Sequence, residues 1–382
     1  MAVDAVDRET LLKALAHRFT RFAEIDGRDD PLYVALATAI ASDVALTALL
    51  AEAPATQHLP VLLLAALHDR VLAGTAHPLA AYYASVGGTR APDAELPALL
   101  KDFVGRESSA LLTLLRTRTT QTNEIGRCAV LRPALQALAV RLGGRPEAPS
   151  ALALFDFGCS AGLNLGVDRY AYDDGIAPVE GDASGDVAPP VIRSEWRGAP
   201  PQSLPGPRAW TVSHRHGVDL FPIDPADEAA TRWLRACLWP GDAARRARLD
   251  GALALARRYP APLVRSDDGL TVLERWLDTL PSGVQPVLFN VWVLAYFDPE
   301  GWRRHLDRIE RLVRARGLAW ISGEMGKLAP LSDVPASPPG ESPHSATLWT
   351  LQWRSPAGLR TEALAWSHPH GRWIEWLDRP AA

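Results

Sequence analysis

The sequence is poor in cysteine and in long apolar runs, and both shortages exclude classes of protein. Its three cysteines, Cys128, Cys159 and Cys237, lie far apart and form no C-x-x-C pair. Such a set favours neither a disulfide framework nor a structural zinc site, and it fits a reducing compartment. The longest apolar run near the N-terminus, residues 59–67, is far too short to span a bilayer. We therefore predict a soluble cytoplasmic protein with no membrane partner.

Lysine is scarce as well, because Lys13, Lys101 and Lys327 are the only lysines among 40 basic residues. With 44 acidic residues, the net charge is -4 and the isoelectric point is about 6.2. A general nucleic-acid-binding surface needs an excess of positive charge, so this balance argues against one. His214 and His216 alternate on one predicted strand, but no acidic or cysteine neighbour completes a metal site. We predict no bound metal, and the sequence does not predict an oligomeric state.

Helical patterns alone fill the first part of the chain. Apolar residues recur at helical spacing at Leu11, Leu15 and Phe19, and Asp30-Pro31 is typical of a helix N-terminus. No run there resembles a strand. We predict an N-terminal helical domain, residues 1–145, with further helices over 59–73, 95–117 and 124–142.

From residue 151 the pattern changes to alternating strands and helices, which is typical of a mostly parallel sheet. The runs near the C-terminus alternate apolar and polar residues, as antiparallel edge strands do. We therefore predict an α/β fold over residues 151–382, with a Rossmann-like, mostly parallel sheet and C-terminal antiparallel strands. A Pro/Gly/Asp-rich segment, about 173–208, interrupts it, and we expect a lid or substrate insert there.

The most informative motif is the loop after the first predicted strand. An apolar run over 152–157 is too short for a helix and suits a buried parallel strand. The glycine-rich stretch Gly158-Cys159-Ser160-Ala161-Gly162 follows, and we expect a helix from about Leu163. Glycine permits a positive φ or lets a ligand approach the main chain. The first N–H groups of the expected helix would favour negative charge on that ligand.

Several interpretations of this loop remain open. Asp156 lies two residues before Gly158, which is the spacing of an S-adenosylmethionine loop in class I methyltransferases. The same stretch also spells G-x-S-x-G, the nucleophile elbow of α/β-hydrolases, with Ser160 as the nucleophile. The dinucleotide fingerprint G-x-G-x-x-G is not matched, because Ser160 stands where its second glycine should be. An ordinary tight turn between a strand and a helix is the remaining interpretation.

A polar segment, TTQTNEIGR at residues 119–127, leads into the last helix before this strand. In one interpretation Thr122 or Asn123 caps that helix and Glu124 belongs to its first turn. In the other interpretation the segment faces a cofactor cleft, because the helix directly precedes the strand that carries the glycine loop. The residues that would then face the cleft are Gln121, Asn123, Glu124 and Arg127.

Acidic residues also follow the second and third predicted strands. Asp219 comes just after the second strand, where Rossmann-like folds place the acidic residue that binds ribose hydroxyls. Asp267 and Asp268 come after the third strand. One of them either caps the next helix or lies near an adenine amino group.

Taken together, TTQTNEIGR, FDFGCSAGLNL and HRHGVDLFPID resemble a bacterial family of unknown function with a core similar to class I methyltransferases. The resemblance to that core covers about residues 151–377. It implies a cofactor, S-adenosylmethionine, and methylation of a small molecule or another substrate that is not a nucleic acid. The cofactor-binding residues that it implies are Asp156, Gly158, Cys159, Ser160, Gly162, Asn164, Asp219, Asp267 and Asp268.

The fourth predicted strand departs from the amino-methylating families, which carry an Asn/Asp-Pro-Pro-aromatic motif there. This chain has Asn290-Val291-Trp292-Val293, which argues against N-methylation of a base or amide by that motif. Catalytic candidates are Tyr296, Glu124 and Asn290, with Glu324 as a further candidate general base. Each of these side chains also has a structural interpretation.

Two functions other than methyl transfer stay open. A serine hydrolase would use Ser160 with an acid and a histidine later in the chain, Asp267 or Asp298 and His344 or His368. Against it, α/β-hydrolases have several strands and an oxyanion loop before the serine, and nothing before Leu152 resembles a strand. The altered fourth-strand motif favours instead a protein that keeps the cofactor fold for binding or regulation and has lost catalysis.

Overall fold

The computed structural model describes residues 2–144, 148, 150–176, 178–182, 188–201 and 208–377. The chain folds into two compact units. The first comprises Met1–Thr122 and Asp227–Ala247, and the second comprises Asn123–Ala226 and Arg248–Ala382. We expected one division, near residue 145. The structure instead assigns the helix over 128–141 to the second unit and returns a later segment of the chain to the first.

The first unit consists of helices around a core rich in leucine and aromatic side chains. Leu15, Phe19 and Phe103 are fully buried in that core. The Asp30 carboxylate accepts a hydrogen bond from the Tyr33 backbone N–H at 3.0 Å, which caps a helix as the sequence suggested. Its α-helices are α1 (Ala2–Arg21), α2 (Pro31–Ser42), α3 (Val44–Leu50), α4 (Pro60–Leu72), α5 (Leu96–Thr117) and α7 (Glu228–Ala236).

Helix α7 joins the first unit through three specific contacts. The Arg232 guanidinium pairs with buried Asp69 at 3.0 Å. The Trp233 indole, buried in the helical core, donates to the Thr119 carbonyl at 2.9 Å. The His68 Nδ1 lies 3.1 Å from the Ala236 carbonyl oxygen. Local periodicity cannot reveal such long-range contacts. For this reason the sequence assigned α7 to the predicted α/β fold over residues 151–382.

No single helix in the described part of the chain is long and apolar enough to cross a membrane. Helices α2 and α3 meet the length and composition criteria only when joined, and the chain bends by 106° between them. Both helices bury leucines in the core of the first unit.

The second unit is built on a mixed sheet. Five strands run parallel: β1 (Ser150–Phe157), β5 (Trp210–Asp219), β6 (Leu263–Arg265), β7 (Gln285–Val291) and β8 (Ala319–Glu324). Three antiparallel strands extend it: β9 (Thr347–Ser355), β10 (Gly358–Ser367) and β11 (Trp373–Trp376). The described strands are ordered β4-β11-β10-β9-β8-β7-β1-β5-β6. This confirms the predicted α/β class, with a mostly parallel sheet, C-terminal antiparallel strands and a helical N-terminal region.

The strand order determines where a ligand would bind. Counted along the chain, the five parallel strands lie side by side in the Rossmann-like order 3-2-1-4-5. Strand β1 is therefore flanked by β5 and β7, and the chain direction across the sheet reverses at β1. In such sheets ligands bind outside the carboxyl ends of the strands at this reversal. The loop after β1 occupies that position.

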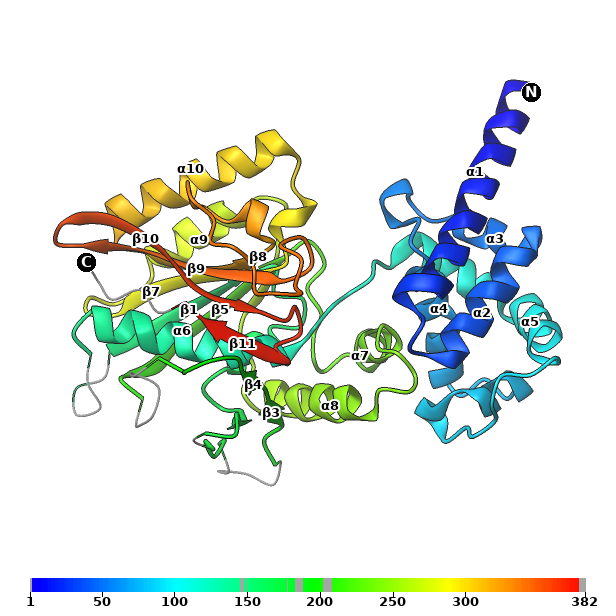
Figure 1. Ribbon diagram of the computed structural model, residues 1–382, viewed down its shortest axis with the longest axis horizontal. Coiled ribbons are helices and arrows are strands. Elements are labelled where there is room, and N and C mark those ends of the chain that lie inside the picture. Colours follow the sequence, from blue (N-terminus) through cyan, green and yellow to red (C-terminus); the bar gives the residue numbers. More distant parts are fainter. Residues whose placement is uncertain are drawn as a thin grey trace. The chain divides into compact units, whose positions relative to one another are not determined.

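Helices cover both faces of the sheet in the second unit (Figure 1). On one face, α9 (Gly269–Leu277) and α10 (Pro299–Arg316) pack against Phe155, Leu288 and Trp320. On the other, α6 (Cys128–Arg141) contacts β5, β9 and β10. Helix α6 is buried around most of its circumference, which explains why it belongs to the sheet rather than to the helical unit. Helix α8 (Ala243–Arg258) leads into β6.

The helix expected from about Leu163 does not form, so this prediction is wrong. The described chain instead has a short 3-10 turn, η6 (Leu163–Gly166), and then β2 (Ala171–Asp173), which pairs with β3 (Val191–Arg193). The Tyr170 hydroxyl donates to the Leu163 carbonyl, and Arg215 Nε donates to the Leu165 carbonyl at 2.9 Å. In an α-helix these carbonyls would accept from backbone N–H groups four residues later. Side-chain donors therefore occupy backbone carbonyls that would accept hydrogen bonds in an α-helix.

The predicted insert over 173–208 is described in part, because residues 177, 183–187 and 202–207 lie outside the described residues. Its later half contributes β4 (Glu195–Trp196), which pairs in parallel with β11 at the sheet edge. The Arg197 N–H donates to the Ile374 carbonyl at 2.7 Å, and its guanidinium pairs with Glu341 at 2.8 Å. A lid function for this segment remains a prediction.

Two glycines allow two turns of the second unit to touch. Gly126 lies in the short turn η5 (Ile125–Arg127), and Gly371 ends the turn over 368–371. A Cβ on either glycine would overlap the backbone of the other turn. Arg127 joins the same turns, because its guanidinium donates to the carbonyls of Pro369 at 3.2 Å and Val291 at 3.1 Å.

We predict that Gly371→Ala destabilises the protein far more than Gly317→Ala does. Both glycines have similar positive φ angles, +69° and +64°, so both substitutions carry the same backbone cost of about 1 kcal/mol. Nothing lies within 4 Å of a Cβ added at Gly317, whereas at Gly371 it meets the Gly126 backbone. Urea unfolding should show an additional loss of about 2 kcal/mol or more for Gly371→Ala. Equal losses would contradict the close approach.

Candidate functional site

Unusual backbone geometry gathers at the carboxyl ends of β1 and β7. Within the loop over 158–162, φ is +81° at Gly158, +49° at Ser160 and +66° at Gly162. Ser160 and Trp292, which has φ +59°, are the two non-glycine residues with positive φ in the described part of the chain. Such conformations cost of order 1–3 kcal/mol and cluster at functional sites. The switch point of the sheet therefore carries the backbone strain of the described chain.

The glycines of this loop allow close packing within the protein. A Cβ on Gly158 would overlap the Val293 side chain, and one on Gly162 would lie 2.8 Å from Leu263. The space beside Gly158 is therefore filled by the loop after β7. Substituting Gly158 would disturb this packing, so it is a poor test of ligand access.

Most backbone N–H groups of the loop are already used inside the protein. Those of Gly158 and Cys159 donate to the Val218 carbonyl at 2.8 and 3.1 Å. The Gly162 N–H donates to the Cys159 carbonyl at 2.7 Å. Because no α-helix follows, the expected set of free N–H donors at a helix start does not form in the described chain.

Asp219 ties the loop to the end of β5. Its Oδ2 accepts a hydrogen bond from the Ser160 N–H at 2.8 Å, and its Oδ1 accepts one from the Phe221 N–H at 2.8 Å. The carboxylate is half-buried and thus holds the strained Ser160 backbone in place. Each oxygen retains a second lone pair, so ribose binding by Asp219 stays a prediction.

Asp156 is the most unusual carboxyl group of the site. It is 3% exposed, and its Oδ2 has no hydrogen-bond partner among the described residues. Burial raises the pKa of this carboxyl well above its usual range; the nearby Asp219 charge raises it further, and Arg127 opposes both. A buried polar atom without a partner costs about 1–3 kcal/mol, so a ligand that supplies a donor here would recover that cost.

The polar segment before α6 meets the glycine loop, as the cleft interpretation requires. The Asn123 amide donates a hydrogen bond to the Ser160 hydroxyl oxygen. The Cys128 thiol lies 3.3 Å from the Asn164 side-chain oxygen, and burial raises its pKa well above the usual value. Cys159 of the loop is also buried, which likewise raises the pKa of its thiol. Neither thiol is therefore an activated nucleophile.

Glu124 has the structural role that the sequence left open. It is 2% exposed, and its Oε1 accepts from the Gly126 N–H at 2.9 Å. The same oxygen lies 3.5 Å from the Arg248 guanidinium. Arg248 is one of several arginines on α8, and the sequence did not indicate that it pairs with Glu124. Gln121 belongs to the first unit, where its amide donates to Thr119, and its place at the cleft stays a prediction.

The end of β7 is held by a buried amide and a buried carboxyl. The Asn290 amide donates to Glu324 Oε1 at 2.8 Å, and its oxygen accepts from the Trp320 indole at 2.7 Å. Glu324 Oε1 also accepts from the N–H groups of Val293 and Leu294 at 2.7 and 3.1 Å. Both polar side chains are fully buried, so in this structure they fix the turn after β7 and face no solvent.

Glu324 carries the second unsatisfied carboxyl oxygen of this region. Its Oε2 is buried and has no hydrogen-bond partner among the described residues. Burial raises the pKa of Glu324 to about 6, although the backbone N–H groups, Asn290 and the Arg127 charge lower it. Arg127 is thus the common positive group near both Asp156 and Glu324.

The remaining candidates are spread around the edge of the sheet. Tyr296 lies on a short turn after β7 and is 80% exposed. Asp268 caps α9 through the Thr271 N–H at 3.1 Å and pairs with Arg308 at 2.9 Å. Asp267 is exposed, which leaves it as the freer carboxylate at this strand end.

The residues of the hydrolase interpretation do not assemble into a triad in the described structure. Ser160 is hydrogen-bonded by Asn123 rather than by a histidine. Asp298 caps α10 through the Gly301 N–H at 2.7 Å, His344 is exposed, and His368 Nδ1 accepts from the His370 N–H at 2.9 Å. No group of three potential metal-ligating side chains gathers within the described ranges either.

Residues 16–376 match a protein family described as "Uncharacterized protein conserved in bacteria (DUF2332)". The chain belongs to this family. The match covers nearly the whole chain and confirms the resemblance drawn from the three motifs. The family description states no activity, so the function has to be argued from the site.

Solved structures add a distant likeness. One that matches is the sugar N-methyltransferase KedS8 from Streptoalloteichus sp ATCC 53650, at 13% identity and a TM-score of 0.20. The match covers 60% of this chain and 70% of that one. No curated protein matches the chain.

We predict that Glu324 makes the protein less stable as the pH rises. Its folded-state pKa, about 6, lies above the ordinary glutamate value of 4.5, so the folded state favours the protonated form. Its contribution is fully present below pH 4.5 and is lost as the pH rises through about 6. From pH 4 to 7, Glu324 should lower the unfolding free energy of the unmodified protein by an amount on the order of 2 kcal/mol. Urea unfolding of Glu324→Gln should not show this loss. The control variant Glu310→Gln, at an exposed ion pair, should still lose stability as the pH rises. If both variants showed the same pH dependence, the assignment to Glu324 would be contradicted.

Proposed function

We propose that the chain is an S-adenosylmethionine-dependent methyltransferase that acts on a small molecule or another substrate that is not a nucleic acid. The observation that carries this proposal is the construction of the loop after β1. It lies at the switch point of a sheet ordered 3-2-1-4-5, has a strained backbone, and borders a buried carboxyl with an unsatisfied oxygen. A cofactor that combines an ammonium, a ribose and an adenine suits this edge.

The donor and acceptor groups fit the parts of that cofactor. Asp156 Oδ2 lacks a donor, and the ammonium of a methionine moiety would supply one. Asp219 at the end of β5 keeps lone pairs for ribose hydroxyls, and exposed Asp267 at the end of β6 would accept from an adenine amino group. The loop N–H groups contribute little, because most are used within the protein.

When bound, the cofactor would supply a methyl group on a positively charged sulfur. The protein would contribute positioning and electrostatics. Tyr296, exposed on the turn after β7, would contact an acceptor, whereas Asn290 and Glu324 are buried and hold that turn. The buried state of Asn290 is the observation that favours the inactive alternative, a protein that binds the cofactor without transferring its methyl group.

We predict that S-adenosylmethionine and S-adenosylhomocysteine bind the purified full-length chain. Asp156→Asn keeps the shape of the side chain but replaces one carboxyl oxygen by an NH2 donor and removes its possible negative charge, so calorimetry should show about tenfold weaker binding or worse. Asp224→Asn is the matched control, since this exposed aspartate only accepts from the Ala226 N–H in its own turn. Absence of heat with either ligand, for a chain shown to be folded by circular dichroism, would refute the cofactor assignment.

Asp219→Asn separates the two roles of that carboxylate. If Asp219 binds ribose, the variant loses affinity beyond what its lowered melting temperature explains. A destabilised variant with wild-type affinity would limit Asp219 to holding the Ser160 backbone.

The hydrolase alternative rests on one observation, the positive φ of Ser160 within G-x-S-x-G, which is typical of a nucleophile elbow. We predict that a fluorophosphonate probe does not label Ser160, because this residue is only 6% exposed and its hydroxyl oxygen accepts a hydrogen bond from Asn123. Mass spectrometry of the treated protein checks this. Labelling that disappears in Ser160→Ala would overturn the methyltransferase proposal.

A further inference from the structure

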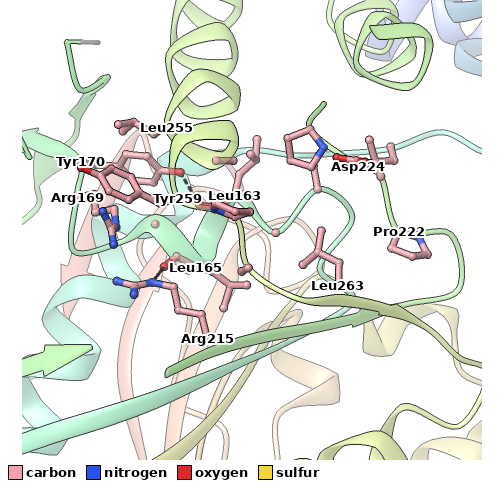
Figure 2. Close-up of a pocket in the computed structure, with 18 residues that line it drawn as sticks. Leu163, Leu165, Arg169, Tyr170, Arg215, Pro222, Asp224, Leu255, Tyr259 and Leu263 are labelled. Carbon is pink, nitrogen blue, oxygen red and sulfur yellow. Dashed lines mark hydrogen bonds between the residues drawn. The ribbon is translucent and has the colours of Figure 1, made fainter. Parts of the chain in front are cut away.

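A cavity of about 390 Å³ lies in the second unit, bordered by Gly162 at the end of the glycine loop and by the residues of η6. Figure 2 shows it between the segment after the glycine loop, the C-terminal part of α8 and the strands β5 and β6. A crossover helix would normally cover this part of a parallel sheet. Here η6 takes the place of that helix, and its residues line the cavity together with Arg215 of β5 and Leu263 of β6.

Most of the cavity wall is apolar. Leu163 and Leu165 come from η6, Leu255 from α8 and Leu263 from β6. Pro222 and Pro225, between β5 and α7, and Pro260, before β6, add rigid apolar surface. The volume lies at the lower end of the range for small-molecule sites, which are typically apolar with a few placed polar groups.

Two arginines supply the polar groups, and Figure 2 shows them at the same end of the cavity. Arg169 lies 3.5 Å from the centroid of the Tyr259 ring and pairs with Asp182 at 3.2 Å. Arg215 donates through Nε to the Leu165 carbonyl and pairs with Asp168 at 2.6 Å. Both guanidinium groups are thereby fixed before any ligand arrives.

These arginines keep hydrogen-bond donors beyond their present partners. Within the described structure, Arg169 Nη2 and Arg215 Nη1 have no hydrogen bond, and Arg169 Nε is buried without one. A third guanidinium, from Arg208, donates to the Asp168 carbonyl at 3.0 Å. Arg208 does not line the cavity, and Asp168 and Asp182 balance the charges of Arg169 and Arg215, so a ligand would meet free donors rather than an excess of positive charge.

We propose that this cavity binds a small organic acid with a flat apolar body, its carboxylate at Arg169 and Arg215. Arginine pairs planar carboxylates through two parallel hydrogen bonds, which suits donors held in fixed positions. The leucines and Tyr259 enclose the apolar body. A larger negative charge is disfavoured, because Asp168, Asp182 and the rim residue Asp224 are close. This inference does not depend on the proposed methyl transfer.

The test compares an acid with its neutral counterpart on the unmodified full-length chain, without S-adenosylmethionine. The probes are hydrocinnamate, hydrocinnamide and phenyl phosphate, titrated by calorimetry and by protein NMR. We expect hydrocinnamate to bind at least about tenfold more tightly than the amide, and phenyl phosphate to bind more weakly than hydrocinnamate. Equal binding of acid and amide, or no binding of hydrocinnamate up to about 10 mM, would overturn the proposal.

Variants locate the site. Arg169→Gln should weaken hydrocinnamate binding about tenfold, whereas Arg258→Gln should not. Arg258 is the matched control, because it also lies over the Tyr259 ring, at 5.4 Å, but does not line the cavity. Ala256→Trp, which fills the cavity from α8, should abolish binding. Full binding by a folded Ala256→Trp protein would place the ligand elsewhere and refute the assignment, even if Arg169→Gln fails to fold.

Discussion

Two hydrogen bonds from side chains to backbone carbonyls determine the structure of the segment after β1 in the second unit. Tyr170 and Arg215 take the carbonyls of Leu163 and Leu165, and the chain after β1 therefore cannot continue as a helix. The glycine loop consequently lacks a helix N-terminus and relies on Asp219 to hold Ser160 in its strained conformation. The turn η6, which stands where that helix was expected, lines the cavity that contains Arg169 and Arg215. The same two hydrogen bonds thus influence both the glycine loop and the cavity.

The two buried carboxyl groups at the carboxyl edge of the sheet, Asp156 and Glu324, both lie near the Arg127 cation. Its guanidinium is committed to two backbone carbonyls, so it positions the ends of β7 and of the turn after β10. At the same time its charge lowers the pKa of Asp156 and Glu324, while burial raises the pKa of both. Two carboxyl groups with unsatisfied oxygens near a single cation form an arrangement that a donor-bearing ligand would stabilise. A purely structural core would more often replace such groups with apolar ones.

Local patterns predicted the elements well, because periodicity reflects which face of each strand or helix is buried. They predicted that Asp156 ends a buried strand and that Asp219 follows the second strand, and they left the capping role of Asp268 open. They failed where distant side chains decide the structure. Nothing near Leu163 indicates that Arg215 will take the Leu165 carbonyl, and nothing in α7 indicates that Arg232 will pair with Asp69. The contact between Gly126 and Gly371 is likewise visible only in three dimensions.

The turn after β7 shows why the altered motif is more than a loss of prolines. Proline fixes φ near −65°, whereas Trp292 has φ +59°, so this backbone excludes proline at that position. The Trp292 N–H, which proline lacks, donates to the Gly323 carbonyl at 3.0 Å. Glu324 then fixes the turn by accepting hydrogen bonds from the N–H groups of Val293 and Leu294. The Asn290 amide is turned inward to support Glu324. At this turn the Tyr296 ring is therefore the exposed group, whereas the Asn290 amide is buried and cannot contact a ligand without a change of the turn.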